Sequence, residues 1–244
     1  MAVKIIPTGK GLAREELLSI VRVNETIREG VGEHLVRVFH IHEVGGESPA
    51  FFVVMEHMEH GTIADLLPAR ETKDIRRGIP PEQACKLTAS LLEGLQLLHE
   101  NGLSHYDIKP GNIFLSSKNR STVKIGDYGL LKPSAAAIPN AGTASYRPPN
   151  DRPPDHRTDI YAAGAALFEL IFHRDPQDAA EWMYRDNKES ADPLSPRVQA
   201  VIAKAMHLLP ERRYQSAREM LDDINAILAG NTAGNAGRRT KIVA

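Results

Sequence analysis

The spacing of the apolar residues changes near residue 68, and this change limits the possible folds more than any other feature of the sequence. After it, helical spacing dominates, beginning with PPEQACKLTASLLEGLQLLHENG (80–102). Before it, a segment at 12–29 also has helical spacing, and three segments alternate as strands do: AVKII (2–6), HLVRVFHIHEV (34–44) and PAFFVVMEHM (49–58). The pattern predicts a small mixed sheet with one helix, followed by a larger helical region.

Local signals divide the chain further. Pro80 and Pro81 suit the first turn of a helix and Gly102 suits its C-terminal cap. EHGTIADLL (59–67) is a short connection, placed where a hinge with a ligand cleft could lie. The apolar run at 160–172 is too short to span a bilayer and contains a glutamate, so it predicts a buried core helix and no membrane span. The Gly-, Asn- and Ala-rich end predicts a flexible tail, residues 230–244.

The composition indicates a globular protein. Of the 244 residues, 42% are hydrophobic and 25% are charged, which allows a substantial core. The formal net charge of −1, with scattered basic residues, gives no general attraction to nucleic acid, so no nucleic-acid partner is expected. The single cysteine, Cys85, excludes an internal disulfide and predicts a packed thiol. With no signal peptide at the start, these features favour a cytoplasmic location. No feature indicates an oligomeric state.

Residues that can carry chemistry gather in HYDIKPGNIFL (105–115), between a predicted helix and a predicted strand. His105, Asp107 and Asn112 have the spacing H-x-D-x-x-x-x-N, with Lys109 two positions after the aspartate. A second polar element, IGDYGLL, follows the strand-like STVKI and contains Asp127. One such residue alone would more often be a cap or a turn residue. The ordered set instead favours a catalytic site.

These motifs, and the order of the segments around them, resemble a eukaryotic-type protein kinase over roughly residues 1–229. The resemblance implies an α+β, protein kinase-like, two-lobed fold with a truncated, small, β-rich N-lobe (about 1–58) and a larger helical C-lobe (about 59–229). It also implies a serine/threonine protein kinase, which uses Mg²⁺ and transfers the γ-phosphate of ATP to Ser/Thr hydroxyls of protein substrates. The position of Lys109 resembles the Ser/Thr-specific branch of the family.

The resemblance assigns roles that suit phosphoryl transfer, a reaction that needs positioning and charge neutralisation more than covalent chemistry. Asp107 would orient the substrate hydroxyl and accept its proton, and Lys109 would neutralise the γ-phosphate. Asn112 and Asp127 would bind Mg²⁺ through oxygen atoms. GTASYRPP (142–149) resembles the end of the activation segment, and RTDIYAAG (157–164) the start of the central buried helix. In that pattern Thr143 would bond Lys109 and Asp107, and Asp159 would hold the catalytic-loop backbone.

The same resemblance places the nucleotide. MAVKII is similar to the strand whose lysine, here Lys4, anchors the α- and β-phosphates of ATP. FFVVMEHMEHGT is similar to the strand and hinge that bind adenine through the backbone of Glu56 and Met58, with Met55 bordering the pocket. Ala2 and Phe114 would enclose the adenine ring. Methionines at these positions could equally be core-filling thioethers.

The small lobe departs from the family pattern, which begins with two strands joined by a Gly-rich loop. Met1 stands just before the alanine of the phosphate-anchoring strand. Either the sequence starts downstream of a natural start, or another segment covers ATP, or the lobe is degenerate. The glutamate partner of Lys4 is also open between Glu25 and Glu16.

Three further positions differ from the pattern. Tyr106 replaces an arginine that in many kinases grips a phosphorylated activation segment. Asn150 replaces the glutamate that would pair with Arg213, so we expect the Asn150 carbonyl or Asp151 to take part of its role. Tyr128 replaces phenylalanine in the D-F-G element, a mild change.

Two alternatives to an active protein kinase remain at the level of sequence. A pseudokinase would use the helical lobe for binding or scaffolding, with weak or no nucleotide clamping, as the missing loop suggests. A kinase-like phosphotransferase for small molecules is less attractive, because GTASYRPP resembles a segment that shapes a peptide-binding surface.

Overall fold

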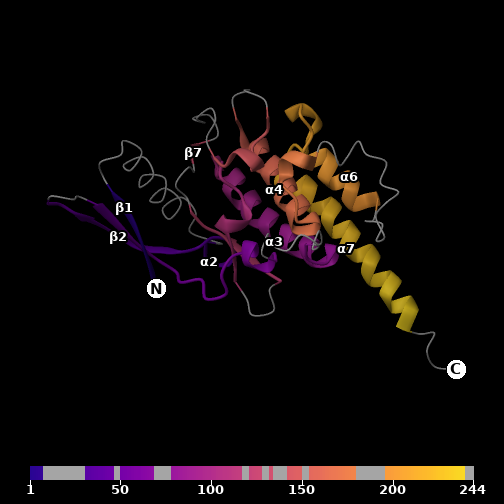
Figure 1. Ribbon diagram of the computed structural model, residues 1–244, viewed down its shortest axis with the longest axis horizontal. Helices are drawn as coiled ribbons and strands as arrows, with labels where there is room; N and C mark the ends of the chain where they lie inside the picture. The colour runs from indigo at the N-terminus through magenta and orange to yellow at the C-terminus, as the bar shows by residue number, and fades with distance from the viewer. Residues whose placement is uncertain are drawn as a thin grey trace.

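The sheet predicted at the start of the chain is present in the computed structural model, at one end of the molecule (Figure 1). Its strands are β1 (Ala2–Pro7), β2 (Val38–Val44) and β3 (Ala50–Met55), in the order β1-β3-β2, and both pairings are antiparallel. Alternation places Ile6 and Val53 in the core. The short helix α2 (Val31–His34) includes His34, the residue expected to begin the second strand.

The structure describes most but not all of the chain. The described residues are 1–7, 31–46, 50–68, 78–116, 121–127, 132–133, 142–149, 154–179 and 196–239, with backbone alone at 31–32, 132–133 and 231–239. The helix predicted at 12–29 lies outside them, together with Glu16, Glu25, Tyr128, Asn150 and Asp151.

The helical region also follows the sequence. Helix α3 (Pro81–Glu100) has proline in its first turn and is followed by Gly102 in the left-handed conformation, φ 71°. Helix α4 (His156–Phe172) is buried on nearly all sides, as its apolar sequence predicts, and its N-terminus is capped by the Asp155 side chain. Helices α6 (Pro196–Ala205) and α7 (Ala217–Arg239) complete the bundle, in which α3 contacts both α4 and α7 (Figure 1).

Short strands and turns connect these helices. Strand β4 (Leu103–Ser104) pairs with β7 (Lys132–Pro133), and β5 (Ile113–Leu115) pairs with β6 (Val123–Ile125). The 3₁₀ turns are η1 (Ile63–Leu66), η2 (Pro110–Asn112), η5 (Ala144–Tyr146), η6 (Pro176–Asp178) and η7 (Pro210–Arg212). The three-stranded sheet followed by the helical region confirms the predicted two-lobed α+β architecture.

The flexible tail expected at residues 230–244 stays a prediction, and residues 240–244 lie outside the described part of the chain. Helix α7 continues through residues 230–239, where its last turns project beyond the other helices (Figure 1). A helix already nucleated by packed residues such as Ile224 and Ile227 can extend without a new nucleation cost. Within the described part of the chain, no helix combines the length and the apolar character needed to cross a membrane.

Cys85 is packed, as predicted. It is 1% exposed on α3, and burial, with a smaller contribution from Glu82, raises the pKa of its thiol to about 11. A thiol with so high a pKa is almost entirely protonated at neutral pH and is a poor nucleophile. Cys85 is therefore a core residue.

Candidate active site

The loop between β4 and β5 gathers the predicted catalytic residues around one carboxylate. Asp107 Oδ2 accepts hydrogen bonds from Lys109 Nζ at 2.8 Å and from Asn112 Nδ2 at 2.9 Å. Its Oδ1 accepts from the backbone N–H of Thr143 at 3.0 Å and from the Thr143 hydroxyl at 2.9 Å. Lys109 Nζ also donates to Thr143 Oγ1 at 2.8 Å. The bonds expected of Thr143 are thus present, and they join residues 142–149 to the loop that carries Asp107.

These bonds set the charge of Asp107, whose side chain is 13% exposed. Burial by itself raises the pKa of this carboxyl, but the hydrogen bonds from Lys109 and Thr143 and the Lys109 charge outweigh burial. The pKa of Asp107 is therefore lowered, and the group is a carboxylate at neutral pH. An ionised acceptor at this place can orient a hydroxyl group.

Asp159 fixes the loop from below, as expected from the resemblance. Its fully buried carboxylate accepts the backbone N–H of His105 and of Tyr106, each at 2.8 Å, and faces His99 Nε2 at 2.9 Å. Tyr106 has φ 62°, a conformation that is costly for a residue with a Cβ. The Asp159 bonds hold the backbone in this conformation directly before Asp107.

His105 connects the catalytic loop to the segment that carries Asp127. The ring is fully buried, its Nδ1 accepts the Asp107 N–H at 3.3 Å, and its Nε2 lies 3.0 Å from the Gly126 carbonyl. With Nδ1 as the acceptor, the geometry suits a hydrogen on Nε2 that points at the Gly126 carbonyl. His105 thus holds two functional segments together.

Lys4 and Asp127 are brought together although they lie far apart in the sequence. Lys4 Nζ is 2.5 Å from Asp127 Oδ1, and Asp127 has φ 58°. Both side chains are partly exposed, at 35% and 42%. The sequence predicted a glutamate partner for Lys4 but not this direct contact, because no local spacing relates residues from different elements.

The residues expected to bind Mg²⁺ fit that ion. The Asn112 amide nitrogen donates to the Asp107 carbonyl and carboxylate, which leaves its amide oxygen as a possible ligand. The Gly126 N–H donates to the Asn112 carbonyl at 3.0 Å, so the segment that ends at Asp127 lies beside Asn112. No group of three or more His, Cys, Asp or Glu with metal-site geometry occurs among the described residues. Two protein oxygens completed by phosphate oxygens and water suit Mg²⁺.

The predicted adenine-binding residues lie around the junction of sheet and helical region. Ala2 is the register partner of Met55 across β1 and β3. Phe114 on β5 forms a bridge with Thr62, in the connection that follows Met58. A Cβ added at Gly126 would lie 2.7 Å from the Phe114 ring, so glycine allows this close approach. Contact of these residues with adenine stays a prediction.

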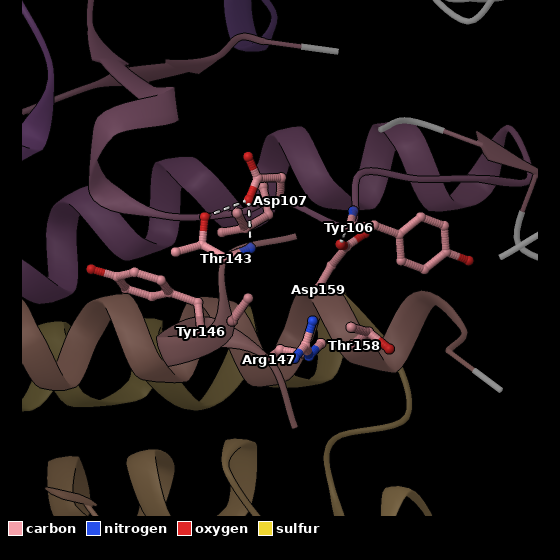
Figure 2. A pocket seen from close by; sticks show the side chains of 9 residues that line it. Tyr106, Asp107, Thr143, Tyr146, Arg147, Thr158 and Asp159 are labelled. Carbon is pink, nitrogen blue, oxygen red and sulfur yellow. Dashed lines mark hydrogen bonds between the residues drawn. The ribbon is translucent and has the colours of Figure 1, made fainter. Parts of the chain in front are cut away.

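A small hollow lies next to Asp107, between the loop that carries it, residues 142–149 and the start of α4 (Figure 2). Its volume is about 10 Å³, room for about one water molecule. Figure 2 shows the Tyr106 ring pointing away from Asp107. Tyr106 is 5% exposed, and burial raises the pKa of its hydroxyl to about 12. Its hydroxyl is therefore neutral, unlike the arginine it replaces.

Arg213 is satisfied by backbone groups in the described structure. Its guanidinium donates to the carbonyls of His207 at 2.7 Å, Leu208 at 3.2 Å and Arg157 at 3.4 Å, and it lies over the Tyr161 ring. Burial lowers its pKa to about 10, so it is still cationic at neutral pH. The proposed contacts from residues 150 and 151 lie outside the described residues.

Besides the Lys4–Asp127 pair, sequence reasoning missed two further contacts. His99, on α3, contacts the buried Asp159 carboxylate, and its place in the last turn of an amphipathic helix gave no sign of this. Glu56 forms an ion pair with Lys124 on β6, at 2.5 Å. The one sequence signal for this pair is the alternation in β6, where Lys124 lies between two buried residues and therefore faces the opposite side of the strand.

Comparison with known proteins points to one family. Residues 1–226 match the family model described as protein kinase domain. A probable serine/threonine-protein kinase of Streptomyces coelicolor is 32% identical over 203 residues, covering 75% of this chain and 29% of that protein. The serine/threonine-protein kinase PknB of Mycobacterium leprae is 30% identical, covering 75% and 31%. A probable serine/threonine-protein kinase of Corynebacterium efficiens is 33% identical over 232 residues, covering 84% and 33%. The chain thus spans 29 to 33% of the length of these relatives.

Proposed function

This chain belongs to the protein kinase family, and we propose that it transfers the γ-phosphate of ATP to Ser/Thr hydroxyls of protein substrates, using Mg²⁺. The observation that carries the proposal is the cluster of Asp107, Lys109, Asn112 and Thr143. Its bonds hold an ionised carboxylate, a cation and an amide in fixed relation. Because these groups are already in place, little reorganisation of the site is needed when charge develops in the transition state.

Each residue of the cluster would contribute through its charge or its hydrogen bonds. Asp107 would accept a hydrogen bond from the substrate hydroxyl and then its proton, since its lowered pKa keeps it ionised. Lys109, held between Asp107 and Thr143, would face the transferred phosphate with its positive charge. Lys4 would anchor the α- and β-phosphates. Mg²⁺, when bound by Asn112 and Asp127, would neutralise charge on the phosphates.

Transfer of radiolabelled phosphate tests the proposal. The purified protein, with Mg²⁺ and γ-labelled ATP, is expected to label a generic basic protein substrate, and acid hydrolysis is expected to yield phosphoserine or phosphothreonine. Omitting Mg²⁺ should abolish labelling. Nucleotide binding measured by calorimetry without any transfer would contradict the proposal and favour a scaffolding pseudokinase. Label on tyrosine alone would contradict the Ser/Thr assignment.

We also expect activity that does not depend on phosphorylation of the activation segment. The neutral Tyr106 cannot give the charge-assisted bonds that an arginine gives to a phosphate. The Thr143 hydroxyl already bonds Asp107 and Lys109, so a phosphate there would crowd the catalytic group. Phosphatase treatment, checked by intact mass, should leave the initial rate unchanged. An order-of-magnitude loss, restored by rephosphorylation within residues 134–145, would contradict this expectation.

A further inference from the structure

Glu56 uses both oxygens of its carboxylate to connect three segments of the chain. Its Oε1 lies 2.5 Å from Lys124 Nζ on β6, and its Oε2 accepts the Arg37 N–H at 3.2 Å. The side chains of Lys124 and Glu56 are 12% and 29% exposed. A charge-assisted bond with so little access to water is stronger than an ordinary surface ion pair.

Backbone hydrogen bonds run beside this ion pair. The Glu56 N–H donates to the Arg37 carbonyl at 2.8 Å, and the Val36 N–H donates to the Ile125 carbonyl at 2.8 Å. Leu35 forms a bridge with Ile125. We name this group of residues the interlobe joint: Leu35, Val36, Arg37, Glu56, Lys124 and Ile125. It connects the end of the sheet to β6 of the helical region.

The interlobe joint lies between the two ends of the proposed nucleotide site. At one end, the backbone of Glu56 is the expected partner of adenine. At the other end, β6 leads through Gly126 to Asp127, the expected Mg²⁺ ligand and the partner of Lys4. The Gly126 N–H is itself fixed to the Asn112 carbonyl at 3.0 Å. The Glu56–Lys124 pair and the backbone bonds beside it therefore lie on the connection between the adenine end and the phosphate end.

We propose that Glu56 and Lys124 are positioning residues, whose ion pair fixes the spacing between the adenine-binding backbone and Asp127. This inference rests on the proposed function, because it concerns ATP. A ligand that contacts both ends gains affinity only when the two ends are held at the matching distance. The ion pair thus determines how tightly the whole nucleotide binds, while the catalytic cluster around Asp107 is left unchanged.

Three variants test the inference: Glu56→Gln, Lys124→Met and the double variant. Glutamine retains an oxygen that can accept the Arg37 N–H, so this change removes the charge with little change of shape. Each variant is expected to weaken Mg²⁺-ATP binding about tenfold, the scale of a lost charge-assisted bond. Adenosine, which occupies one end only, should bind within about twofold of the native affinity. The double variant should match the single ones, because each single change already breaks the same pair.

Matched controls come from α3, where Lys86 and Glu82 form an exposed pair at 2.8 Å. Glu82→Gln and Lys86→Met remove the same charges away from the site, and Mg²⁺-ATP affinity should stay native. Calorimetry gives both dissociation constants, melting curves report the fold, and steady-state rates separate KM for ATP from kcat. KM should rise while kcat stays within about twofold, since the transition-state contacts are intact.

Different outcomes separate the inference from the proposed function. Native-like ATP affinity in Glu56→Gln and Lys124→Met would overturn the inference and leave the proposed function standing. An equal loss of adenosine and ATP binding, together with a lowered melting temperature, would also overturn the inference, because that result indicates a purely structural ion pair. If the unaltered protein binds ATP but transfers no phosphate, the proposed function fails while the affinity measurements still decide the inference. If the unaltered protein binds no nucleotide, the inference and the proposed function both fail.

Discussion

Replacing Asp107 with asparagine is expected to lower the rate of phosphotransfer by at least about a hundredfold, while ATP binding persists. Asparagine keeps the size of the side chain but removes the negative charge and the proton acceptor. Lys109 Nζ and the Thr143 hydroxyl would then donate to a neutral amide in place of the carboxylate that they bond now. Initial rates with labelled ATP, together with calorimetry of Mg²⁺-ATP, measure the two effects separately.

The matched control is Asp222→Asn, which changes an exposed aspartate on α7 whose partner is Arg218. This variant should keep the native rate.

The pH profile adds an independent check. Because the pKa of Asp107 is lowered, the group stays ionised through the ordinary carboxyl range, and activity is lost only as the pH falls through its lowered pKa. Equal rates for native protein and Asp107→Asn would contradict the assignment.

Asp159→Asn is expected to reduce both stability and activity. The buried carboxylate accepts the N–H groups of His105 and Tyr106, and an amide in its place offers one oxygen instead of two. Leaving a buried N–H without an acceptor costs about 1–3 kcal/mol, so the melting temperature should fall by several degrees. The backbone before Asp107 would lose the bond that holds Tyr106 at φ 62°. A displacement of about 1 Å at a catalytic group can cost about a hundredfold in rate.

Asp155→Asn provides the comparison for Asp159, because both aspartates lie at the start of α4. Asp155 caps the helix by accepting the Arg157 N–H at 2.8 Å, and among the described residues it has no hydrogen bond to the loop that carries Asp107. Loss of its charge should lower stability and leave kcat close to native. If Asp159→Asn loses stability and keeps the native kcat, the loop does not depend on Asp159 for its geometry.

Much of the fold could be predicted because its signals are local. Alternation predicted β1 and β3, the Pro80-Pro81 pair and Gly102 marked the ends of α3, and the apolar run in α4 predicted its burial. The flexible tail stays a prediction, and the continuation of α7 into residues 230–239 was not expected, since propensity alone does not report that a helix is already nucleated by packing upstream. A cytoplasmic location stays a prediction.

The candidate site also combines groupings that the sequence predicts with pairs that it does not. Asp107, Lys109 and Asn112 lie within one turn-rich loop, so their grouping follows from short spacings that the sequence itself contains. The pairs Lys4–Asp127 and Glu56–Lys124 were decided only by the tertiary structure. Their partners come from separate elements, and nothing in the periodicity of one element specifies which residue of another it will face. Packing of the sheet on the helical region determines those distances, because residues remote in the chain meet only when the cores of both regions have formed.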